Sequence, residues 1–184
     1  MADMTFAEFL AIQHYKAQFV EPLATRLRAL IVERISAALE WAEYGNAGAL
    51  GQPVLPKFKS DHNSEVGMVS TAWPVLMVIP IETASFTEDF IGLEHQLHVQ
   101  ADVVGKDGNR LTTEAMLYLK AIIHVVLSLK SSDWTAQWPA GSQKPGGIAW
   151  DVINHDYGTL RGNKKATMYK RSVSCRVEVK AVEA

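Results

Sequence analysis

The sequence has little cysteine, and this scarcity excludes two classes of architecture. Cys175 is the only cysteine among the 184 residues. A single thiol cannot build an internal disulfide framework or a thiolate zinc cluster, because both need several cysteines. The fold is therefore expected to depend on a hydrophobic core, which 48% apolar residues are sufficient to build.

A long apolar run and a strong charge of either sign are also missing. No run of about 18 apolar residues is present, so no membrane span is expected. The N-terminal apolar residues are interrupted by Glu8, Gln13 and His14, which is not the pattern of a signal peptide. The net charge of −2 gives no overall attraction to nucleic acid or anionic lipid. These features favour a soluble protein of the cytoplasm that folds as one domain over 1–184.

Helical patterns occupy the first quarter of the chain. The motif TFAE at residues 5–8 predicts a capping box and a short helix. Pro22 is expected to end that helix and to begin a second one over Pro22–Tyr44, because proline is tolerated in a first turn. Residues 1–21 would then form an N-terminal helical extension.

A further helix is expected after the turn GKDGN, beginning near Thr112 or Thr113 and running to about Leu129. Apolar residues recur along it at helical spacing and should face the core. They are Met116, Leu119, Ile122, Ile123, Val126 and Leu127.

The stretch LEHQLHVQADV, Leu93–Val103, alternates apolar and polar residues, which predicts a strand with one apolar and one polar face. His95 and His98 are three residues apart, so on a strand they point to opposite faces. We therefore expect no metal ion shared by these two histidines.

Three more strands are predicted. Val75–Glu82 is apolar on both faces, and Pro80 within it indicates an edge or a bulge. The segment 148–154 alternates, with Asn154 expected on the face of Ile148, and Ser172–Val182 alternates most clearly. The predicted class is α+β: a mixed, mostly antiparallel sheet of about four strands with helices packed on one face. Residues 45–73 and 130–147 are expected to be long loops.

Motifs for catalysis are missing as well. The sequence has no serine elbow, no zinc-protease helix motif and no dinucleotide fingerprint, so no catalytic, cofactor-binding or metal-binding residue is predicted. Cys175 is expected on the buried face of the last strand, as a small apolar residue rather than a nucleophile. We interpret the chain as a protein that is not an enzyme.

Two sets of residues favour association with a partner. Trp134 and Trp138 lie in an irregular polar segment, where they form an interface or cap the end of the core. Arg161, Lys164 and Lys165 lie in a basic loop that faces solvent, an acidic neighbour or passing DNA.

The order of these elements resembles the tail terminator and neck (head–tail completion) proteins of tailed bacteriophages. The resemblance is carried by the helix Pro22–Tyr44, the strand pair PVLMVIPIE and LEHQLHVQADVVG, the helix TTEAMLYLKAIIHVVLSL and the strand SVSCRVEVKAV. It implies a subunit that closes into a ring, a homohexamer in that family, and belongs to the virion tail or neck after assembly in the host cytoplasm. The implied partners are further copies of the chain, the tail-tube protein and the head-side connector. Genome DNA would pass through the ring without specific binding.

Two other functions remain open. One is a small intracellular ligand-binding domain that uses the polar sheet face, with Gln96, His98 and Arg176, and has a concave polar pocket. The other is a motif-less enzyme built on His124 or His155.

Overall fold

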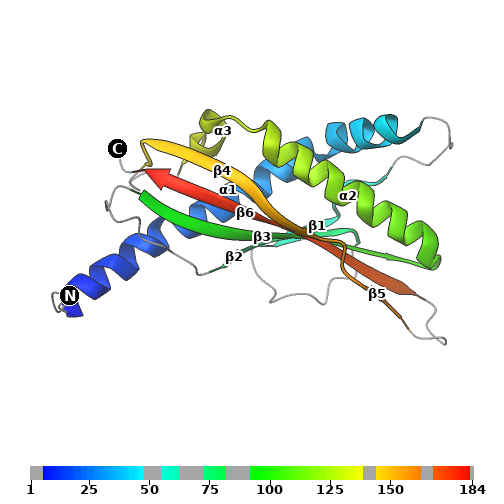
Figure 1. Cartoon of the computed structure of the whole chain (residues 1–184), viewed down its shortest axis with the longest axis horizontal. Helices are drawn as coiled ribbons and strands as arrows, with labels where there is room; N and C mark the ends of the chain where they lie inside the picture. The colour runs from blue at the N-terminus through cyan, green and yellow to red at the C-terminus, as the bar shows by residue number, and fades with distance from the viewer. Residues whose placement is uncertain are drawn as a thin grey trace.

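Two helices cross one face of a twisted sheet, so the protein has a helix layer and a strand layer (Figure 1). The computed structural model describes residues 6–47, 55–62, 73–81, 92–138, 144–162 and 168–182. The α+β class is confirmed. In chain order the elements are α1 (Phe6–Ala47), β1 (Ser60–His62), β2 (Val75–Ile81), β3 (Gly92–Gly105), α2 (Gly108–Ser128), α3 (Ser131–Thr135), β4 (Gly147–Asp156), β5 (Leu160–Arg161) and β6 (Tyr169–Val182).

The sheet is mixed and mostly antiparallel, in the order β1-β2-β3-β6-β4, with β5 paired to β6. Only β1 and β2 pair in parallel among the strands that the structure describes. The sheet has six strands rather than the four predicted. The two that the prediction missed, β1 and β5, lie in segments expected to be loops. Strands of three and two residues are too short to produce a periodic signal in the sequence.

The central strand β3 has the two faces that its alternation predicts. Leu97 and Val99 are wholly buried under the helices, whereas Gln96 and His98 are partly exposed on the other face. His95 is buried on the apolar face, so the two histidines do point to opposite sides. Across the described residues, no group of three metal-ligating side chains could hold an ion.

Pro80 lies where β2 forms the edge of the described sheet. The short strand β1 pairs with β2 only from Val75 to Met77, so it does not reach Pro80. The missing N–H of proline therefore interrupts no ladder on that outer side, as the edge prediction requires.

The first two predicted helices form one helix. α1 has 42 residues and continues through Pro22. The predicted boundary is therefore wrong. Proline removes one backbone hydrogen bond and bends a helix, but it does not end one when the flanking segments are both helix-forming. On its C-terminal side, Leu23, Leu27 and Leu30 are all wholly buried and anchor the helix to the core.

Helix α2 begins four residues earlier than Thr112. Asp107 is its N-cap: the carboxylate accepts hydrogen bonds from the N–H groups of Asn109 at 2.9 Å and Arg110 at 3.2 Å. These bonds satisfy two of the free N–H groups of the first turn. The hydroxyl of Thr112 instead donates to the carbonyl of Gly108 at 2.9 Å, within the helix.

By length and composition alone, α2 is apolar enough to cross a membrane, with a mean hydropathy of 1.3 over its apolar window. The helix is not an uninterrupted apolar run, because Arg110, Glu114 and Lys120 lie within it. Half of the window is buried inside the fold, where α2 contacts α1, β3 and β6. The core helix of a compact domain has the same property.

The short helix α3 lies in the segment 130–147 that was expected to be a loop, and Arg34 fastens it to α1. The Arg34 guanidinium donates to both carboxylate oxygens of Asp133, at 2.8 and 3.1 Å. The N–H of Lys130 donates to the same carboxylate at 2.8 Å. These two donors, Arg34 first, hold the pKa of Asp133 below its ordinary value of 3.8.

We expect Asp133→Asn to lower the free energy of unfolding by about 1 kcal/mol at pH 7. The substitution removes the bidentate salt bridge with Arg34, which lies at a partly exposed site. The pKa of Asp133 is depressed in the folded state, so its stabilisation is present above pH 3.8 and is lost as the pH falls through the folded value. Urea denaturation at pH 7 and at pH 3 measures this. A stability difference of equal size at both pH values would contradict the assignment.

Glu114→Gln is the matched control. It removes the pair with Arg110 on the surface of α2, where the two side-chain atoms are 2.7 Å apart. Such i,i+4 pairs contribute only about 0.3–0.5 kcal/mol.

Candidate functional site

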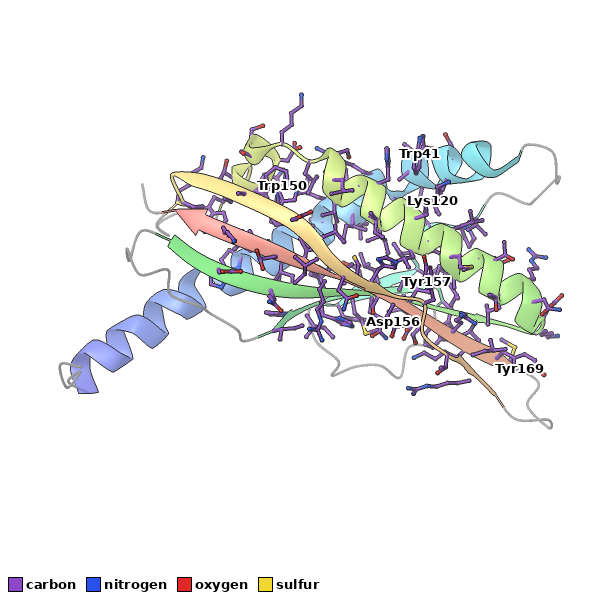
Figure 2. All side chains as sticks on the ribbon, in the orientation of Figure 1. Trp41, Lys120, Trp150, Asp156, Tyr157 and Tyr169 are labelled. Carbon is purple, nitrogen blue, oxygen red and sulfur yellow. The ribbon has the colours of Figure 1, made fainter. Side chains whose placement is uncertain are left out.

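An apolar groove of about 550 Å³ follows the exposed side of α2. Its walls come from α1, α2 and the end of β4, and Trp41 and Tyr157 lie on opposite sides of α2 in the view of Figure 2. Residues that determine its character are Trp41, Met116, Ile123, Leu127, His155 and Tyr157.

The groove exists because α2 is apolar on two opposite sides. The side that faces the sheet and α1 is fully buried and includes Ala115, Tyr118 and Ile122. Met116 and Leu127, which were expected in the core, are instead 44% and 58% exposed. At 100° per residue they lie on the far side of the helix from Tyr118 and Ile122, so that prediction is wrong.

Two stacked rings and a lysine form one wall of the groove. The Trp41 ring of α1 stacks on the His124 ring of α2, with centroids 3.9 Å apart and planes within 13°. The ammonium of Lys120 lies 5.0 Å from the centroid of the same indole, near it in Figure 2. Trp41 is nevertheless 45% exposed. A partly exposed tryptophan fixed by its neighbours is typical of a binding surface.

A bulge in β4 builds the other wall. Val152 pairs with Val177 and Asn154 pairs with Arg176, so Ile153 is an extra residue in the strand. Beyond it, His155 pairs with Cys175, on the face that carries the helices. Asn154 was expected on the face of Ile148, and the bulge moves it to the polar face.

The T-shaped contact of His155 with Tyr157 completes this wall. The two rings lie 5.3 Å apart, with planes at 79°. Both side chains line the groove, which the bulge makes possible by turning His155 toward the helices.

A smaller polar pocket of about 350 Å³ lies on the outer face of the sheet at the same bulge. His98 and Arg176, which the sequence suggested for ligand binding, are paired neighbours there. Gln96 pairs with Glu178 further along the sheet and is not among the lining residues. Asn154 joins the lining because the bulge turns it outward.

A row of polar contacts leads along the outer face from His98. The His98 ring lies 3.2 Å from the amide oxygen of Gln100, and the Gln100 amide donates to Asp102 at 2.8 Å. Asp102 is wholly buried despite being on the polar face. Lys170 covers it, with its ammonium 2.6 Å from the carboxylate and 5.3 Å from the Trp73 ring centroid. At its Asp102 end, the row of polar contacts is therefore buried and paired within the protein, and it offers no binding site there.

Of the predicted interface residues, the structure describes Trp134, Trp138 and Arg161, and these three differ in exposure. Trp134 exposes no surface, and its ring lies 5.7 Å from that of Trp150 inside the core. An interface role for Trp134 is therefore wrong, and the alternative that it caps the end of the core holds. Trp138 is partly buried and packs against the same core. Arg161 is exposed on β5, whereas Lys164 and Lys165 lie outside the described residues.

Two further cations, Lys170 and Arg171 at the start of β6, already have partners within the chain. The Arg171 guanidinium donates to the carbonyls of Tyr157 and Gly158 at 3.1 and 3.3 Å and to the Thr112 hydroxyl at 3.2 Å. Lys170 pairs with Asp102. Neither cation is fully available to an acidic neighbour or to DNA.

Cys175 lies on the buried face of β6, as predicted. Burial raises the pKa of its thiol to about 12. The thiolate is the reactive form of cysteine, so the thiol is inert at neutral pH.

No protein-family model matches the chain, and no curated protein sequence matches it significantly. The chain is described by its fold and its surface features. It is an α+β domain with two helices on one sheet face, an exposed apolar groove on the helix layer and a polar pocket on the outer face. The groove is the larger feature, and the sequence signal for it was the breadth of the apolar pattern in α2.

We expect Trp134→Ala to lower the free energy of unfolding by about 3–5 kcal/mol, because it leaves a large cavity in the core. Chemical denaturation followed by far-UV circular dichroism measures the loss. Arg161→Ala is the control and should change stability by less than about 0.5 kcal/mol. Equal stabilities for the two variants would place Trp134 at the surface instead.

Proposed function

We propose that the chain is a structural protein of a tailed bacteriophage virion, a tail terminator or neck subunit that assembles into a ring. In this role it ends the growth of the tail tube and joins the finished tail to the head-side connector. The proposal combines the order of elements that resembles this family with the surface of the folded domain.

The observation that carries the proposal is the exposed apolar groove along α2. Trp41, Met116 and Leu127 each expose more than two fifths of their surface and line one hollow. A contiguous apolar hollow of this kind, with Lys120 beside it, is typical of a protein interface with an apolar centre and a polar rim. The groove supports association with another protein more strongly than it supports catalysis.

The sheet edge is a poorer candidate for the subunit contact. Within the described residues, β4 pairs only with β6 and leaves its outer edge open. That edge carries the bulge at Ile153 and the exposed carboxylates of Asp151 and Asp156. Bulges and charges disfavour the addition of a further strand. We therefore assign the contact between subunits to the helix layer.

A ring of this kind acts mechanically. Each subunit places one patch against a different patch of its neighbour, and the contact closes by rotation. One face of the closed ring would bind the last ring of the tail tube, and the other would receive the connector. DNA would pass through the centre, held by no base-specific contact.

The experiment adds the purified chain to tail-tube protein under polymerising conditions and measures tube lengths by electron microscopy. We expect shorter tubes with a ring at one end, and a hexameric mass by native mass spectrometry. Leu127→Asp should abolish both effects, since it places a charge in the groove. Val32→Asp, at an exposed position of α1 that does not line the groove, is the matched control. Unchanged tube lengths with the wild-type chain would refute the proposal.

The polar pocket at His98 and Arg176 favours a second candidate, a small ligand-binding domain. Its volume of about 350 Å³ is sufficient for a small anion or metabolite. This function predicts that phosphate or small carboxylates raise the melting temperature of a monomer in a saturable way. The shift should be lost in Arg176→Ala. No shift with any tested anion would count against this candidate.

A further inference from the structure

The N-terminal part of α1 extends past the sheet. Residues 6–21 form helix and extend beyond the two layers (Figure 1). The sequence of this arm is rich in apolar residues at helical spacing, among them Phe6, Phe9 and Leu10. An apolar helix of this kind is stable in water when a partner covers its apolar side.

The arm and the groove lie at opposite ends of the same helix. Residue 6 begins α1, whereas Trp41, which forms one wall of the groove, is near its C-terminal end. At a rise of 1.5 Å per residue the two positions are separated by about 50 Å along the axis. Because α1 is continuous, the arm does not reach the groove of its own chain.

We infer that the arm of a second copy of this chain, residues 6–21, occupies the apolar groove along α2. The mode is an apolar helix laid into an apolar groove between helical and strand walls. The charges are complementary: the arm carries Glu8 and Glu21 against one lysine, Lys16, while the groove has Lys120 beside Trp41. This inference rests on the proposed ring, and it identifies the surfaces that join neighbouring subunits.

The contact is head-to-tail. Each subunit gives its arm to one neighbour and receives an arm from the other, so the same two surfaces are used at every junction. Pro22 lies at the base of the arm. A proline sets a bend in a helix, and the direction of the arm decides whether successive subunits close into a ring or continue as a filament.

Disulfide cross-linking tests the contact in the full-length chain. Leu10→Cys places a thiol in the arm, and Leu127→Cys places one in the groove. The natural Cys175 is buried and adds little background. Under mild oxidation, a mixture of the two single variants should give a covalent dimer, and the double variant should give a ladder of linked chains.

Each outcome decides the inference. A ladder supports it. A fast-migrating monomer from the double variant would show that the arm folds back on its own groove, and no cross-link at the highest soluble concentration would show that the arm binds elsewhere; both overturn it. Pairing Leu10→Cys with Val32→Cys is the control and should give at least tenfold less dimer.

Native mass spectrometry of the reduced wild-type chain separates this inference from the proposed ring. A ladder without a closed hexamer would retain the arm contact and refute the ring. A hexamer that resists Leu127→Asp and gives no ladder would retain the ring and refute the arm contact. If the inference holds, Leu127→Asp weakens self-association by about ten- to a hundredfold, the effect of losing a residue at the centre of an interface.

Discussion

The antiparallel pairing of β3 with β6 is the constraint on which the rest of the structure depends. Fourteen consecutive residue pairs, from Gly92 with Val182 to Gly105 with Tyr169, hold the two strands in one register. That register places Leu97 beside Val177 on one apolar face of the sheet. Helices α1 and α2 cover this face. A shift of one residue would move the whole apolar set to the outer face. The burial of both helices, and therefore the position of the groove between them and β4, follows from this pairing.

The apolar surface of α2 exceeds what one sheet can cover. One side of the helix is buried in the core. The other side carries Met116, Ile123 and Leu127, which line the groove. Trp41 adds an indole that His124 and Lys120 hold in place. An isolated domain gains nothing from this surplus, whereas an assembling subunit gains an interface. The same reasoning applies to α1, which is longer than the sheet it crosses (Figure 1).

A single extra residue in β4 organises both candidate sites. The bulge at Ile153 turns His155 toward the helix layer and Asn154 toward the polar face. One side of the strand end therefore contributes to the apolar groove, and the other contributes to the polar pocket of His98 and Arg176. Bulges re-aim side chains in this way because they change which face each later residue occupies.

The sequence by itself determined the two long strands, the α+β class and the body of α1, because alternation and helical spacing are local properties of the chain. Ser172–Val182 and Leu93–Val103 are strands with the predicted faces. Tertiary structure decided the rest. The burial of Trp134 and the exposure of Leu127 depend on which surfaces distant segments cover. The continuation of α1 through Pro22 follows from the helix-forming segments on both sides of the proline. An amphipathic pattern shows that a side chain can be buried, but only packing decides whether a neighbour is there to bury it.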